Sequence, residues 1–113
     1  MDPIELKAAC LGLNGAAEEF PFGPETSVFK VGGKIFATLG YPDADWGMVK
    51  LTPEQQSVLV EAEPDIFRSV PGGWGKYGNT NVRLAKVDAT TLKSALTMAW
   101  QNLAPKPAPR GKG

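Results

Sequence analysis

The sequence predicts an α+β fold, a two-layer domain in which an antiparallel β-sheet carries helices on one face. Two short runs of β-branched and aromatic residues flank Gly32-Gly33, a pattern typical of a hairpin with a two-residue turn. Apolar residues over 92–103 repeat with helical spacing. The expected elements follow the order helix, strands, helix, strands, helix, and their hairpin connections favour an antiparallel sheet.

The first helix is expected to begin with Asp2 as its N-cap and Pro3 as its first residue, and to end near Gly12. Its buried stripe is expected to consist of Ile4, Ala8 and Leu11. Cys10, beside that stripe, is interpreted as a packing residue. Residues 18–22 are expected to be extended, because nearby prolines exclude a helix.

The hairpin is expected to span 26–31 and 34–39. A two-residue turn would set Phe29 opposite Phe36, and opposed residues share one face of a sheet. We expect this face to be buried, because Lys30 on the other face could not be buried without a partner. The buried face would carry Phe29, Val31 and Phe36, and the outer face Val28, Lys30, Ile35, Ala37 and Leu39.

The rest of the chain continues this alternation of strands and helices. A loop over 40–47 and a strand over 48–51 precede a helix that Thr52 and Gln55 start as a capping box. This helix should run to about Ala62. Strands at 66–70 and 82–87 flank a glycine-rich loop at 71–79. The second helix is expected to bury Val58, Leu59 and Ala62; the last, capped by Asp88, should bury Leu92, Ala95, Leu96, Ala99 and Leu103.

Length and composition indicate one domain over residues 1–104, followed by a disordered Pro/Lys/Gly tail over 105–113. With 42% hydrophobic and 21% charged residues, the chain resembles an ordinary soluble globular protein. No apolar run is long enough to cross a membrane, and the N-terminus does not resemble a signal peptide. A single cysteine suits a reducing compartment, so we expect a cytoplasmic protein with no membrane partner.

Charge and residue types narrow the function. The chain has no net charge, but the tail is purely basic, and residues 1–104 hold nine basic against twelve acidic residues. A body with a net charge of −3 attracts nucleic acid poorly. The absence of histidine and the single cysteine exclude His-dependent triads and Cys/His zinc sites. We therefore expect no enzyme, with no catalytic residue, cofactor or metal, and interpret Asp43 and Asp45 as turn formers.

The glycine-rich loop matches G-x-G-x-x-G from Gly73 to Gly78, but a dinucleotide site needs a helix after that motif, and a strand is expected here. Two groups remain as candidate nucleic-acid-binding residues. Lys30, Lys50 and Arg83 alternate with inward apolar residues, and are either solvated side chains or phosphate contacts. Trp74, near Lys76, is either an aromatic plug over the sheet edge or a stacking platform for a base or small ligand.

These features together resemble the MmcQ/YjbR family of small bacterial proteins over about residues 2–103. The residues that carry the resemblance are Glu18 with Phe20-Pro21-Phe22-Gly23, the hairpin from Phe29 to Ala37, Lys50 with Thr52-Pro53-Glu54, Trp74-Gly75, and the last helix with Trp100. The resemblance implies an α+β fold like that of frataxin or secretion chaperones, a DNA-binding role and no catalytic residues. Two features of this chain differ from what the resemblance implies. The chain has no histidine, and residues 1–104 carry a net negative charge.

Three functions therefore stay open. The first is weak DNA or nucleic-acid binding through the outer sheet face and the Trp74 loop. The second is a protein-interaction or dimerisation module that uses Ile35, Ala37 and Leu39 as an outer apolar surface. A small-molecule or enzymatic role has the least support, because no stretch of the sequence specifies a reaction.

Deleting residues 105–113 should leave the melting temperature nearly unchanged, because a Pro/Gly/Lys segment buries almost no apolar surface. Thermal unfolding followed by circular dichroism measures the difference between the full chain and the truncated one. A drop of several degrees would show instead that the tail packs on the domain.

Overall fold

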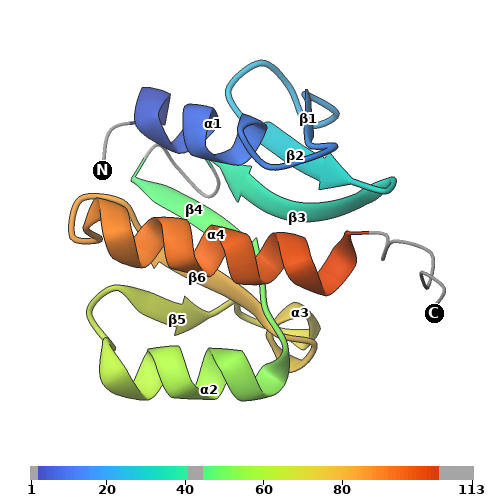
Figure 1. The fold of residues 1–113 in the computed structure, drawn as a ribbon. Helices are drawn as coiled ribbons and strands as arrows, with labels where there is room; N and C mark the ends of the chain where they lie inside the picture. Colours follow the sequence, from blue (N-terminus) through green and yellow to red (C-terminus); the bar gives the residue numbers. More distant parts are fainter. Residues whose placement is uncertain (1–2, 41–44, 105–113) are drawn as a thin grey trace, which may run out of the picture.

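The computed structural model describes residues 3–40 and 45–104. The predicted cap Asp2, Asp43 and the tail 105–113 lie outside the described residues. The elements, in order, are α1 (Pro3–Leu11), β1 (Ala17–Glu19), β2 (Ser27–Val31), β3 (Lys34–Leu39), β4 (Trp46–Lys50), α2 (Pro53–Ala62), β5 (Phe67–Ser69), the one-turn α3 (Gly73–Lys76), β6 (Asn79–Arg83) and α4 (Ala89–Leu103). The α+β class and the predicted element order are confirmed (Figure 1).

The six strands form one antiparallel sheet in the order β1-β2-β3-β4-β6-β5. Helices α1, α4 and α2 lie on the same side of this sheet, as Figure 1 shows, with α4 over the central strands β3 and β4 and α2 beside the edge strand β5. We call the opposite side the outer face. Because strand residues alternate between faces, the strand register decides which side chains reach the outer face.

The hairpin turn forms as predicted. Gly32 and Gly33 have φ of 58° and 79°, a left-handed conformation at both positions that glycine adopts without steric cost. Val31 pairs with Lys34, and Lys30 pairs with Ile35. Beyond these pairs the register changes, because Phe29 lies opposite Ala37 instead of Phe36.

This β-bulge corrects part of the predicted hairpin. One extra residue in β3 lets Phe36 and Ala37 both reach the core and reverses the alternation beyond them, so Leu39 also points inward. The prediction that Ala37 and Leu39 lie on the outer face is therefore wrong. Phe29, Val31 and Phe36 are buried in the core as predicted, while Val28 is buried outside the core cluster.

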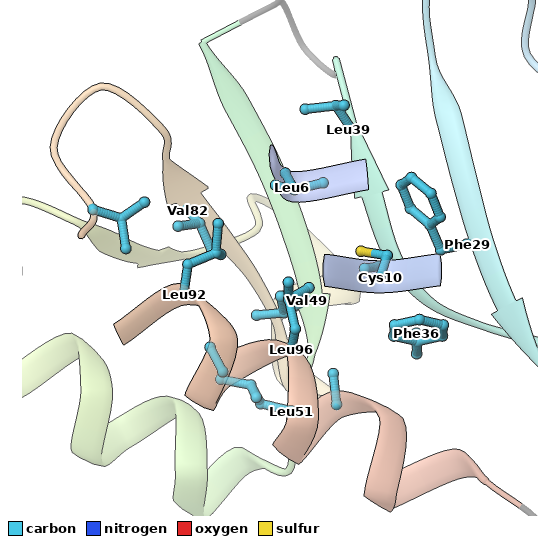
Figure 2. Close-up of a cluster of buried hydrophobic side chains, with 14 of the residues drawn as sticks. Leu6, Cys10, Phe29, Phe36, Leu39, Val49, Leu51, Val82, Leu92 and Leu96 are labelled. Carbon is cyan, nitrogen blue, oxygen red and sulfur yellow. The ribbon is translucent and has the colours of Figure 1, made fainter. Parts of the chain in front are cut away.

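The core joins both layers. Figure 2 shows Leu6 and Cys10 of α1 on the side of the sheet that carries Phe29 and Phe36, and Leu92 and Leu96 of α4 on that side too. The predicted stripe of α1 is wrong where it can be tested, since Ala8 is exposed and Leu11 is 45% exposed. The helix instead docks through Leu6 and Cys10, four residues apart on one face. Cys10 is therefore a packing residue, as predicted.

Helix α2 begins where it was predicted to begin, but it packs through residues other than the predicted ones. Thr52 accepts a hydrogen bond from the Gln55 amide, and the Gln55 side chain accepts one from the Thr52 amide, which completes the capping box. Val58 is 66% exposed and Ala62 is also exposed, so their predicted burial is wrong. Leu59 and Val60 are partly buried against the core instead, because α2 covers only the sheet edge at β5.

The C-terminal part follows the prediction closely. Asp88 precedes α4 in an extended N-cap conformation, and Leu92, Ala95, Leu96 and Ala99 are buried, with Leu103 packed beside them. The indole of Trp100 donates a hydrogen bond to the Asn14 carbonyl at 2.8 Å. Strand β6 begins at Asn79 and ends at Arg83, earlier than the predicted 82–87, and β4 takes in the end of the predicted loop 40–47.

Replacing Phe36 by alanine should lower the free energy of unfolding by about 3–5 kcal/mol, because a fully buried aromatic side chain leaves a cavity. Ile35, its neighbour, is only partly buried and lies outside the core cluster, so Ile35→Ala should cost clearly less. Urea denaturation of both variants measures the two costs. The opposite ranking would contradict the assignment of the faces.

The thiol of Cys10 should react very slowly with alkylating reagents in the folded protein. Burial, with a smaller effect of the Glu18 carboxylate, raises the pKa of Cys10 to about 12, so the reactive thiolate is scarce at neutral pH. Reaction with iodoacetamide, followed by mass spectrometry, should accelerate strongly when urea is added. Fast reaction without denaturant would show that α1 opens readily.

Candidate functional site

The predicted cations Lys30, Lys50 and Arg83 all lie on the outer face, since each alternates with core residues on its strand. The structure does not bring them together. Strand β4 pairs with β6 so that Trp46 lies opposite Arg83 and Lys50 opposite Asn79. Four residues of strand, about 13 Å, therefore separate the positions of Arg83 and Lys50.

Two of these cations already have partners. Nζ of Lys30 lies 3.1 Å from Oε1 of Glu19, and this pair is partly exposed. Nζ of Lys50 donates a hydrogen bond to the Tyr77 carbonyl at 2.9 Å and lies 6.0 Å from the centre of the Tyr77 ring. An incoming phosphate would compete with these contacts, so neither lysine is a freely available cation.

Packing explains two glycines of the G-x-G-x-x-G segment, Gly75 and Gly78, whereas a side chain at Gly73 would meet open space. The segment forms the one-turn α3, where a loop was predicted, and then enters the predicted strand, β6. Gly78 has a φ of 94°, and a side chain there would collide with the Leu51 carbonyl. Lys76 is exposed in α3; the side chain of Trp74 lies outside what the structure describes.

The cations that do converge contact Trp46, a residue of β4 that lies within the predicted loop 40–47. The guanidinium carbon of Arg68 lies 4.1 Å from the centre of a Trp46 ring, and that of Arg83 lies 4.9 Å from it. Such contacts of a guanidinium with an indole stabilise by about 0.5–2 kcal/mol each. Trp46 is only 8% exposed although it lies outside the core cluster.

Three strands build this cluster. Trp46 comes from β4, Arg83 lies directly opposite on β6, and Arg68 belongs to β5 at the sheet edge. One signal in the sequence could have revealed Trp46, namely its two-residue spacing from Met48 and Lys50, which continues the outward positions of β4. No local signal relates Arg68 to either residue, because the pairing of β5 with β6 brings it near.

Beside the cluster lies a pocket of about 150 Å³, lined by Trp46, Arg68, Arg83, Lys86 and residues 64–67. Among residues 3–40 and 45–104, the ion pairs are Lys7 with Glu18 and Lys30 with Glu19, so none involves the cations of this pocket. The Nε atom of Arg83 is buried and has no hydrogen-bond partner there. Asp65 is the acidic residue in the lining. The pocket therefore suits an anion.

The described part of the chain also bears on metal binding and on membrane insertion. No group of three or more histidine, cysteine, aspartate or glutamate residues there is arranged to hold a metal ion. Each described helix is too short or too polar to span a bilayer.

Known proteins resemble this chain in sequence and in fold. The family model named YjbR matches residues 11–102. The crystal structure of Deinococcus radiodurans protein DR2400, with a DUF419 domain, superimposes with a TM-score of 0.72 at 28% sequence identity and covers 84% of this chain and 72% of that one. None of the curated proteins compared with the chain matches it. The match to the family model extends over most of the sequence, and the chain therefore belongs to the YjbR family.

Proposed function

We propose that this protein is a cytoplasmic binding module, not an enzyme, that binds DNA weakly through the outer face of its sheet. One observation carries the proposal: four basic side chains, Lys30, Lys50, Arg68 and Arg83, project from a face that α1, α2 and α4 leave uncovered. Basic side chains spread over one surface bind phosphates without reading base sequence.

The charges of the protein limit the strength of this binding. The negative charge of residues 1–104 opposes the approach of a polyanion, and Glu19 already neutralises Lys30. The arginines near the β5 edge have no carboxylate partner among the described residues, so they would contribute most. We expect affinity at low salt that disappears near physiological ionic strength.

A second candidate, a protein-interaction module, is favoured by a different surface. Phe22 is 70% exposed and Phe20 is 47% exposed, both between β1 and β2. Exposed aromatic side chains are enriched where proteins meet. The apolar surface first expected for this role, built from Ile35, Ala37 and Leu39, does not exist, because Ala37 and Leu39 are buried.

Neutralising the outer face should flatten the salt dependence of DNA binding. Each phosphate contact on duplex DNA contributes about −0.9 to the slope of log K against log salt. The variant Lys30→Gln/Lys50→Gln/Arg83→Gln should therefore flatten the slope by about 2–3, and Arg83→Gln alone by about 0.9. Fluorescence anisotropy of a short labelled duplex over a salt series measures these slopes.

The matched control is Lys93→Gln, which removes one charge from an exposed position on α4, in the helical layer. Its slope should equal that of the unmodified protein. Equal flattening by Lys93→Gln would show that net charge alone acts, and absence of binding at low salt would overturn the DNA-binding proposal. In that case, loss of self-association or partner binding in Phe22→Ser would support the second candidate.

A further inference from the structure

We propose that the pocket beside Trp46 binds a phosphate monoester group. The inference goes beyond the proposed DNA binding, because the phosphates inside a DNA strand are diesters that carry one negative charge each. It also concerns residues that the sequence analysis did not single out, namely Trp46, Arg68 and Lys86.

The charge of the pocket matches a dianion. Arg68, Arg83 and Lys86 contribute three positive charges to the lining, and Asp65 contributes one negative charge. The excess is two positive charges. A phosphate monoester carries close to two negative charges at neutral pH, because its second pKa is about 6. A carboxylate or a phosphodiester would leave one of these charges without compensation.

Both arginines contact Trp46. Their guanidinium carbons lie 4.1 Å and 4.9 Å from the centre of a Trp46 ring, so two like charges share one aromatic side chain and repel each other. The electron-rich face of the indole offsets part of this repulsion. A phosphate that accepts hydrogen bonds from both guanidinium groups would remove it, and arginine suits this because its donors form a planar fork.

One hydrogen-bond donor of Arg83 also lacks an acceptor. Its Nε is buried without a hydrogen-bond partner among the described residues, although buried polar atoms are nearly always satisfied. Leaving a buried donor unsatisfied costs free energy, and the cost is greater when the group is charged. A phosphate oxygen beside Arg83 would supply the acceptor, so ligand binding would recover part of this cost.

The volume limits what can enter. A cavity of about 150 Å³ is known to hold a molecule the size of benzene. The pocket therefore has room for one phosphate group but not for a whole nucleotide, whose remainder would lie along the outer face. The phosphate could belong to a small phosphorylated metabolite or to the 5′-phosphorylated end of a nucleic-acid strand.

Titrations followed by ¹⁵N–¹H NMR, at constant ionic strength, test the proposal through the indole signal of Trp46. Inorganic phosphate and thymidine 5′-monophosphate should each shift this signal saturably, while thymidine and added chloride should not. Arg68→Gln and Arg83→Gln should each weaken phosphate binding about tenfold, which corresponds to the loss of one charge-assisted hydrogen bond. Lys93→Gln, on the helical layer, should leave it unchanged.

Matched oligonucleotides with and without a 5′-phosphate then distinguish the two sources. Tighter binding of the 5′-phosphorylated strand than of its unphosphorylated match, with a shift of the Trp46 signal, identifies a strand end, and equal binding of the two strands, with thymidine 5′-monophosphate still bound, identifies a small metabolite. A Trp46 signal that responds to phosphate no differently from chloride would overturn the inference. This result is independent of duplex binding, so either proposal can fail without the other.

Discussion

Helices cover only one face of the sheet, and this constraint determines where each strand residue points. Every large aliphatic or aromatic residue of the main core lies on the side of α1, α2 and α4. No helix covers the outer face, as antiparallel sheets allow, although some of its side chains, among them Val28, Trp46 and Asn81, are buried. Its side chains are stabilised by one another, through the pair of Lys30 with Glu19 and the contacts of two arginines with Trp46.

The bulge in β3 turns the apolar residues of this strand toward the side of the sheet that carries the helices. Without it, the alternation that starts at the Gly32-Gly33 turn would send Ala37 and Leu39 to the outer face. With it, Phe36, Ala37 and Leu39 all contribute to the core over which α4 lies. A regular hairpin would leave apolar groups exposed and the core incompletely filled. One unpaired residue therefore costs less free energy than a regular hairpin would.

The outer face also explains why a tryptophan can lie outside the core without being exposed. The guanidinium groups of Arg68 and Arg83 both lie against Trp46, which is only 8% exposed. The arrangement concentrates positive charge at the β5 edge of an otherwise acidic body. The proposed DNA contacts and the proposed phosphate pocket both rest on this concentration.

The sequence by itself determined whatever depends on residues close together in the chain. The Gly32-Gly33 turn, the Thr52 capping box, the buried stripe of α4 and the α+β class were all predictable, because turns, caps and helical spacing act within a few residues. It also placed Lys30, Lys50 and Arg83 on the outer face through simple alternation.

Only the tertiary structure decided what depends on packing and pairing between distant segments. The docked faces of α1 and α2 follow from the surfaces that they meet, so Leu6 and Val60 replaced the residues that the pattern favoured. The register of β3 follows from the volume that the core must fill. The pocket at Trp46 unites residues from β4, β5 and β6, and its members meet only because these strands pair across the sheet.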